Sequence, residues 1–376
     1  MARKGLPADM IAATLCRLPA KSLLRLRCLS KSWCSEIDSP SFAQLHLQNS
    51  TATASNLSLV LRHSFLSSVD LERLDAAVVK LDHPLEAHTF GTEILGCCNG
   101  LLALRNSDEE IAFWNPTTRE HRMLPKAEIE PPPGDSRCAF VVYGFGYDSV
   151  HDDYKLVRLA QFYRDGVSSS EAKVYSFRAN AWRGIGDFPY YLRYQRCHGV
   201  LVNNALHWVV GRDESRGGRL IVALDLGTQE YRVVEQPDYG ERKFHLNVKE
   251  LGGCLVIVAN YHPEWVDLWV MKEYGVKESW TELVTLRQPA KPYTFEFVLP
   301  VAYVGDGSKV LLVQDNNKLI CYDLGSEEVD EVRVEGLSKY FEVTLLAGSL
   351  VKLNSGCEGV ANAVNLVGAG ADENQS

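Results

Sequence analysis

The feature that most constrains the fold is a turn followed by an apolar segment, repeated at a nearly constant interval. The second residue of each turn lies at position 100, 153, 204, 253 or 307, so successive turns are about 50 residues apart. The turns are Asn99-Gly100, Asp152-Asp153, Asn203-Asn204, Gly252-Gly253 and Asp306-Gly307. Gly, Asn and Asp favour tight turns, and the apolar segments that follow them, such as LLAL and CLVIVA, are typical of β-strands.

Each unit contains more than one strand. After the turn and its strand come a second apolar segment, such as IAFWNP or VDLWVM, and then a third, such as EHRMLP or SWTELVTL. A further apolar segment ends at each turn, as in FVVYGFGYD. Four strands in about 50 residues is the pattern of a β-propeller blade. Five units are visible in this way.

A sixth unit is split between the two ends of the repeat. Residues 57–83 hold most of the strands of one more blade, and residues 340–354 could complete the ring by pairing with them. Closure of the ring would remove exposed sheet edges. The sequence therefore predicts a mainly β, propeller-like domain of about six blades, with a β-sandwich of many short strands as the alternative.

The residues before this repeat have a helical pattern instead. Ile11, Leu15 and Leu18 fall on one face of a helix. Ser30 is a good N-cap for a later short helix, and residues 38–40 (Asp-Ser-Pro) should end it. The pattern predicts a small α domain of three short helices.

Such a small unit is only marginally stable alone, so either the β-domain or a partner must cover its apolar surface. Residues 1–49 carry seven Lys or Arg against three Asp or Glu, whereas the whole chain has a net charge of −9. A basic unit indicates an acidic partner, although a solvated helical face would also explain it. The overall negative charge argues against nucleic-acid binding, and no apolar run is long enough to predict a membrane span.

Residues 6–42 closely resemble an F-box. The resemblance is carried by the initial Leu-Pro, by Leu-Pro-x-Lys-Ser-Leu at 18–23, by Arg-Cys-Leu-Ser-Lys-x-Trp at 27–33 and by Ser-Pro-x-Phe at 39–42. Alanine at positions 12 and 13 departs from the family, which often has bulkier or acidic residues there. The resemblance implies docking on a small acidic adaptor of the Skp family, which joins such proteins to the cullin and RING subunits of a ubiquitin ligase.

The resemblance also assigns residues. Those implied to lie at the adaptor interface or in the local core are Leu6, Pro7, Ile11, Leu15, Leu18, Pro19, Leu23, Leu24, Cys28 and Trp33. Those implied to meet acidic adaptor residues are Lys21, Arg27 and Lys31. The resemblance does not separate interface leucines from core leucines.

The repeat region resembles the F-box-associated domain, which follows F-boxes chiefly in plants and is related to kelch-type propellers. The matching segments are GCCNGLLAL at 96–104, IAFWNPTTREHRMLP at 111–125 and YGFGYDSVHDDYKLVRL at 143–159. The match is specific through about residue 237 and looser beyond it.

Nothing in the sequence indicates catalysis. There is no H-E-x-x-H or G-x-S-x-G motif, and G-F-G-Y-D at 144–148 lacks the spacing of a phosphate loop. Asp152-Asp153 is interpreted as a turn and Cys98 as a strand-end residue, and His83 with His88 is a weak metal candidate. We therefore expect no catalytic residue, no metal and no cofactor. The alternative is a kelch-like propeller enzyme or small-ligand-binding protein whose N-terminal helices are a structural cap.

Propeller ligands usually meet loops at one end of the ring. The variable loops predicted here are 126–138, 161–171, 186–197, 211–219, 238–245 and 260–266. One of them is rich in residues that are favoured at binding hot spots, namely Tyr190, Tyr191, Arg193, Tyr194 and Arg196. These five residues are the candidate contacts for a target protein.

The predicted organisation is an F-box domain at 1–47, a linker at 48–56, the propeller-like domain at 57–355 and a flexible tail at 356–376. The expected function is that of the substrate-recognition subunit of a Skp–cullin–F-box ubiquitin ligase, with an unknown target protein. The ten cysteines have no C-x-x-C pair and no secretory signal is visible, so reduced thiols and a location in cytoplasm or nucleus are expected.

Overall fold

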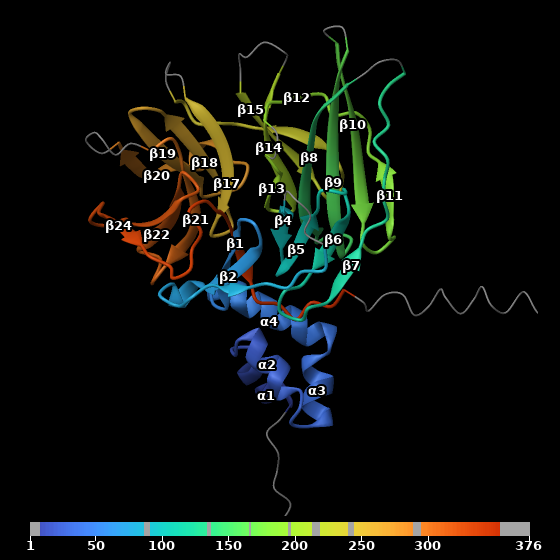
Figure 1. Ribbon diagram of the computed structural model, residues 1–376, viewed down its shortest axis with the longest axis vertical. Helices are drawn as coiled ribbons and strands as arrows, with labels where there is room; N and C mark the ends of the chain where they lie inside the picture. The colour runs from blue at the N-terminus through green and yellow to red at the C-terminus, as the bar shows by residue number, and fades with distance from the viewer. Residues whose placement is uncertain are drawn as a thin grey trace, which may run out of the picture.

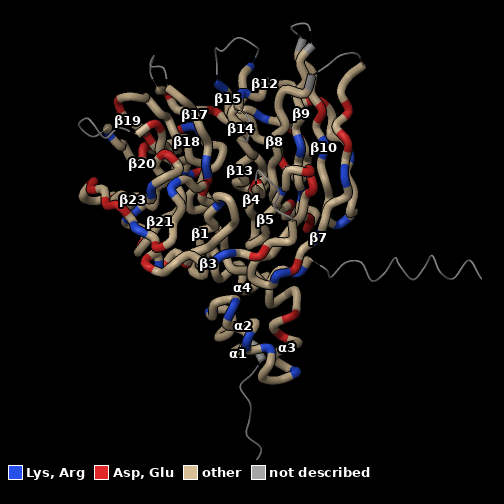
Figure 2. Tube along the Cα trace, in the orientation of Figure 1, with Lys and Arg blue, Asp and Glu red and all other residues tan. Residues whose placement is uncertain are grey.

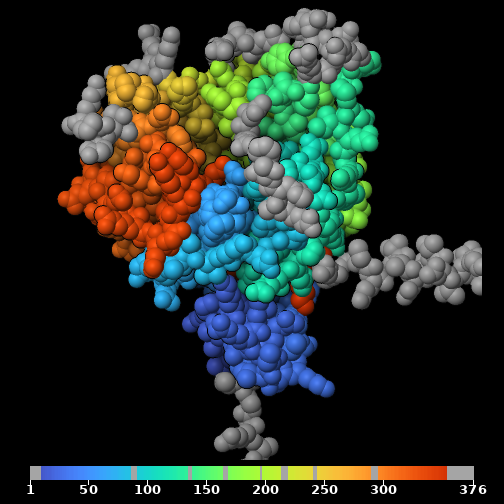
Figure 3. All heavy atoms as spheres, in the orientation of Figure 1, coloured from blue at the N-terminus to red at the C-terminus, as the bar shows by residue number. Residues whose placement is uncertain are grey.

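A computed structural model describes residues 8–85, 91–133, 137–164, 167–194, 197–212, 219–239, 244–288 and 295–353. It contains two parts, a helical unit and a ring of six β-sheets (Figure 1). The helices project from one end of the ring as a separate knob, as the space-filling view also shows (Figure 3). The predicted tail at 356–376 lies outside the described residues.

The helical unit holds four helices rather than the three that the sequence predicts. They are α1 (Ala8–Leu15), α2 (Ala20–Leu26), α3 (Lys31–Ile37) and α4 (Pro40–Ala52). Ser30 caps α3 as predicted, since its Oγ accepts a hydrogen bond of 3.1 Å from the Trp33 N–H.

The fourth helix begins inside the predicted break. Ser39 caps it by accepting from the Phe42 N–H, and Pro40 occupies its first turn, where a missing N–H costs nothing. Because α4 continues through Ala52, the predicted linker at 48–56 is helical over its first half. The segment looked like a linker because its side chains are small and polar, but α4 buries residues spaced along one face, including His46 and Ser50.

The strands form the six blades of a propeller. Blade 1 contains β4 (Glu93–Cys98), β5 (Leu101–Arg105), β6 (Ile111–Trp114) and β7 (His121–Met123). Blade 2 contains β8 (Arg137–Asp148), β9 (Asp153–Arg164), β10 (Val167–Ser176) and β11 (Ala181–Gly184). Blade 3 contains β12 (Tyr191–Leu192), β13 (Val200–Val202), β14 (Ala205–Gly211), β15 (Arg219–Asp225) and β16 (Tyr231–Val234).

The remaining blades follow the same antiparallel order. Blade 4 contains β17 (His245–Leu251), β18 (Cys254–Tyr261), β19 (Trp265–Met271) and β20 (Trp280–Arg287). Blade 5 contains β21 (Val298–Val304), β22 (Lys309–Gln314), β23 (Lys318–Asp323) and β24 (Val329–Val332). Blade 6 combines β25 (Glu342–Ala347) with β1 (Leu57–Arg62), β2 (Leu66–Asp70) and β3 (Val79–Lys80). Two short 3-10 helices, η1 (Leu71–Arg73) and η2 (Lys277–Ser279), lie between strands.

Blade 6 closes the ring as predicted. β25 pairs with β1 in an antiparallel register that places Leu345 opposite Leu59. The strand from the far end of the repeat thus completes the sheet that begins it, and both edges of the ring are joined. The propeller prediction is confirmed, and the β-sandwich alternative is wrong.

The predicted turns are also confirmed. Asn99, Asp152 and Asn203 adopt φ of 51°, 52° and 48°, conformations that Asn and Asp tolerate better than most residues. Gly100 adopts φ of 77°, and its backbone lies so close to Ser349 that an added Cβ would be 2.2 Å from the Ser349 Cβ. Both features require glycine at this position. One loop prediction is wrong: at 161–171, β9 runs to Arg164 and β10 resumes at Val167.

The core lies between the blades. Adjacent sheets pack face to face, with Trp114 buried between blades 6 and 1 and Trp208 between blades 2 and 3. One innermost strand from each blade, β4, β8, β13, β17, β21 or β25, faces a central channel of about 750 Å³. Thr51 of α4 also lines this channel, so the helical unit lies at one of its ends.

Candidate adaptor and target interfaces

The helical unit has a small core of its own. Leu15 and Leu23 have 4% and 0% exposed surface and pack with Ile37 and Phe42. Of the residues implied by the resemblance, these two therefore form local core and have no surface left for an adaptor. Leu6 and Pro7 lie outside the described residues.

Other apolar residues of the unit face solvent. Ile11, Leu18, Leu24 and Trp33 are half-buried against the core and keep part of their surface exposed, and Cys28 is exposed. Sequence reasoning missed the two most exposed large apolar side chains of this segment, one in α1 and one in the turn between α2 and α3. These are Met10, with 56% of its surface exposed, and Leu29, with 67%.

The basic residues of the unit divide into two kinds. Lys21 and Lys31 are exposed. Arg27 is half-buried, and its Nη2 lies 2.6 Å from Oδ2 of Asp38. Although burial opposes the shift, the hydrogen bond from Arg27 lowers the pKa of the Asp38 carboxyl. α2 contains Lys21 and Arg25 and no acidic residue, and Figure 2 shows it as the basic helix of the unit, whereas α3 contains both Lys31 and Glu36.

Pro19 and Lys21 lie on the side of α2 that faces the propeller. Together with Asn56, Asp70 and Thr117 they line a narrow crevice between the helical unit and the ring. Both residues are nevertheless exposed.

A short strap after β25, residues 348–353, joins the two parts. Leu350 is only 3% exposed and inserts into the core of the helical unit. The Lys352 Nζ lies 3.5 Å from Oδ1 of Asp38. The β-domain therefore seals one side of the helical core with a single leucine, and it leaves α1 and α3 facing outward (Figure 1).

The strap is fastened to blade 1 by a buried asparagine. The Asn115 side chain is fully buried, and its Nδ2 donates to the carbonyls of Ser349 at 3.1 Å and Val351 at 2.8 Å. The Leu353 N–H donates to Oε2 of Glu120 at 2.8 Å. The Trp-Asn-Pro motif thus anchors the segment that orients the helices.

The predicted target residues lie at the opposite end of the ring from the helices, near β12 (Figure 1). Tyr190, Tyr191, Arg193 and Tyr194 are all half-buried, and Arg196 lies outside the described residues. The Tyr190 ring packs edge-on against Phe188 at 5.6 Å, and its carbonyl accepts from Gln161 Nε2 at 3.1 Å. This segment is anchored on blades 2 and 3 and keeps part of its aromatic surface exposed.

Comparison with known proteins identifies both parts. The F-box domain family matches residues 4–45. The F-box associated beta propeller domain family matches residues 57–352. The chain belongs to the F-box protein family.

Relatives of this F-box protein match it over almost the whole length. The F-box protein CPR1 of Arabidopsis thaliana is 38% identical over 95% of this chain and 90% of its own length. The F-box/kelch-repeat protein At3g23880 of Arabidopsis thaliana is 32% identical over 82% of this chain and 85% of its own length. Among solved structures, TolB from Acinetobacter baumannii is similar with 10% identity, a TM-score of 0.41, and coverage of 81% of this chain and 70% of TolB. That structural likeness is too distant to transfer a function.

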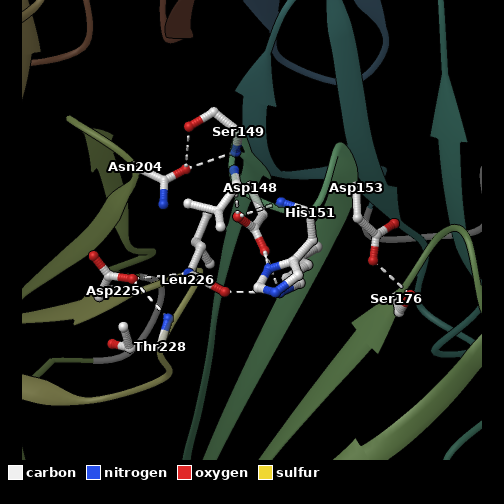
Figure 4. A network of polar contacts seen from close by, with 12 residues as sticks. Asp148, Ser149, His151, Asp153, Ser176, Asn204, Asp225, Leu226 and Thr228 are labelled. Carbon is white, nitrogen blue, oxygen red and sulfur yellow. Dashed lines mark hydrogen bonds and ion pairs between the residues drawn. The ribbon is translucent and has the colours of Figure 1, made fainter.

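The third matching segment, residues 143–159, forms a joint between blades 2 and 3 of this F-box protein (Figure 4). The Asp148 side chain is fully buried and accepts from Lys155 Nζ at 2.5 Å and from His151 Nδ1 at 2.7 Å. Lys155 also donates to the Leu226 carbonyl at 2.7 Å, and the Ser149 N–H donates to Asn204 Oδ1 at 2.8 Å. Burial opposes ionisation, but the hydrogen bonds from Lys155 and His151 lower the pKa of Asp148.

The polar residues considered for catalysis have structural partners. Asp153 accepts from Ser176 Oγ at 2.5 Å and from the Arg178 N–H at 2.8 Å, as expected for a turn residue. Burial raises the pKa of the Cys98 thiol to about 12, so this thiol stays protonated and unreactive at neutral pH.

No cluster of three His, Cys, Asp or Glu side chains with metal-binding geometry occurs among the described residues. His83 is half-buried beside Trp114, and its proposed metal partner, His88, lies outside the described part of the chain. Each cysteine that the structure describes is a free thiol. In the same ranges, no helix has the length and apolar character needed to cross a bilayer.

Proposed function

We propose that this F-box protein is the substrate-recognition subunit of a Skp–cullin–F-box ubiquitin ligase. The helical unit binds a Skp-family adaptor, and through it the cullin and RING subunits. The propeller binds a target protein, which is then ubiquitinated and degraded by the proteasome. F-box proteins are generally non-catalytic, and this one acts by raising the concentration of its target near the transfer machinery. The complex operates in the cytoplasm, the nucleus or both.

The observation that carries this proposal is the position of the helical unit. It projects from the ring, and only one side of its core is sealed by Leu350. Met10 and Leu29 stay exposed on a unit too small to be stable without further cover. Exposed Lys21 and Lys31 complement an acidic adaptor in charge.

The test is coelution of the purified full chain with a Skp-family adaptor. Burial of one leucine is worth about 1.5–3 kcal/mol, so we expect Leu29→Asp to weaken adaptor binding by about tenfold or more. The variant should keep its melting temperature because Leu29 is exposed in the free protein.

Val150→Asp is the matched control, since it places the same charge at an apolar residue that is 71% exposed on the β-domain. It should bind the adaptor like the natural protein. Absence of coelution by the natural chain would refute the ligase role. Equal binding by Leu29→Asp would show that the adaptor uses another face.

A further inference from the structure

The central channel is large enough to hold a small organic molecule. Its volume of about 750 Å³ lies within the range of ligand sites in proteins. Its walls come from the innermost strands, and α4 contributes Thr51 at the helical end. A ligand would therefore enter at the opposite end, beside the loops proposed to contact the target.

Most acidic groups along the wall already have partners. Glu93 accepts from Arg105 Nη2 at 2.6 Å and from His198 Nε2 at 3.2 Å. Nδ1 of His198 accepts from the Tyr143 N–H at 3.2 Å, so Nε2 is the ring nitrogen that donates to Glu93. Burial opposes ionisation of Glu93, but the contacts with His198 and Arg105 lower its pKa to about 2. The negative charge of Glu93 is therefore balanced within this cluster.

The other two carboxylates of the wall are also engaged. Glu342 is bound by both Nε and Nη2 of Arg62, with the Nε contact at 2.9 Å. Glu250 accepts from the Gly253 N–H at 2.5 Å, and burial raises the pKa of its carboxyl. The Glu342 carboxylate is therefore already paired with Arg62, and the Glu250 carboxyl favours its neutral form.

Lys249 is different. It lies on β17, is half-buried and lines the channel, and its ammonium makes no ion pair or hydrogen bond within the described residues. Glu342 is the acidic side chain whose field reaches it, but Arg62 already occupies both oxygens of that carboxylate. Burial lowers the pKa of Lys249. A partly desolvated cation without a counter-ion is costly, and such groups are concentrated at ligand sites.

The wall around this lysine is partly apolar. Val200, Val343 and Leu345 line the channel beside the polar groups. We propose that the channel binds a small amphipathic organic anion, with its carboxylate, phosphate or sulfonate on Lys249 and its apolar body against these three side chains. The bound molecule would lie beneath the target-binding face, so the inference adds a ligand to the proposed recognition role.

The test uses two fluorescent probes on the purified full chain. One is 1-anilinonaphthalene-8-sulfonate, an amphipathic anion, and the other is N-phenyl-1-naphthylamine, its analogue without the sulfonate. We expect saturable binding of the anionic probe that Lys249→Met weakens at least tenfold. Lys249→Arg keeps the charge and should restore most of that affinity. Binding of the neutral probe should not respond to Lys249→Met.

Lys272→Met is the matched control, because Lys272 is an exposed lysine of the same blade. It should leave the affinity for both probes unchanged. A thermal melt adds a second readout: removal of an unpaired, partly desolvated cation should raise the melting temperature, whereas removal of a structural ion pair would lower it.

The proposal is overturned if the natural chain shows no saturable binding, or if Lys249→Met binds the anionic probe as tightly as the natural chain. A lower melting temperature for Lys249→Met would also contradict it. The assay needs neither adaptor nor target, so its failure is distinguishable from failure of the ligase role, and Lys249→Met should still coelute with the adaptor.

Discussion

At the scale of single residues, polar side chains of the family motifs hold the blades together. Asn115 ties the strap to blade 1, and Asp148 ties blade 2 to blade 3 through Lys155. Both side chains are fully buried, so each must have its hydrogen bonds satisfied within the protein. These motifs are therefore explained by packing, and neither needs a catalytic role.

Asp148→Asn should lower the free energy of unfolding by about 3 kcal/mol, because Lys155 would be left buried without its counter-charge. Asp152→Asn is the control, since that carboxylate is exposed in its pair with Arg178 and should contribute at most about 1 kcal/mol. Urea denaturation of both variants measures the difference. Similar losses would contradict the role given to Asp148.

The ion pair between Asp148 and Lys155 predicts a pH dependence of stability. The native pKa of Asp148 is lowered, so its contribution is fully present above the unfolded-state pKa of about 4. The contribution is lost as pH falls through the lowered native pKa. The difference in stability between the natural protein and Asp148→Asn, measured by urea denaturation, should therefore shrink as the pH falls below about 4.

At the scale of elements, α4 and the strap decide how the two parts are joined. α4 lies at the end of the channel and packs near β25, while the strap inserts Leu350 between the helices. Neither role is visible in a local pattern: residues 348–353 look like the end of a strand, and residues 48–52 look like a linker. Their contacts come from residues distant in the chain.

Leu350→Ala should destabilise the helical unit by about 3 kcal/mol, the usual cost of emptying a buried leucine site. Hydrogen exchange should show faster exchange of amides in α2 and α3, with the amides of blades 2 to 5 unchanged. Leu45→Ala is the control within the same unit, because Leu45 is exposed on α4. Equal exchange in both variants would mean that the strap does not support the helices.

At the scale of the whole molecule, the ring separates two faces. The helices lie at one end, and the loops near Tyr190 lie at the other (Figure 1). The ring and the strap fix these two ends relative to each other. A target bound to the loops, as proposed, would therefore have a fixed orientation relative to an adaptor bound to the helices. This geometry depends on closure of blade 6 by β25.

Removal of β25 should open the ring. A chain that ends at Tyr340 lacks both β25 and the strap, so we expect an exposed β1 edge, aggregation in size-exclusion chromatography and no cooperative melt. A chain that ends at Ala347 keeps β25 and should retain a closed ring with a weakened helical unit. Cooperative folding of the shorter chain would refute the closure argument.

Several features follow from the sequence alone. The turns at 99–100, 152–153 and 203–204, the period of the strands and the membership of both domain families are all encoded locally, because turn residues and strand patterns act over a few neighbours. Closure by residues 340–354 could also be predicted, since a ring with five complete blades leaves one sheet unfinished.

Only the tertiary structure decided which leucines are core and which are surface. Leu23 is buried and Leu29 is exposed although both stand in the same leucine-rich segment, because burial depends on what the folded chain places opposite each side chain. The same holds for Leu350 among the helices and for Lys249 in the channel. Contacts between residues far apart in sequence set these environments, and no local pattern contains them.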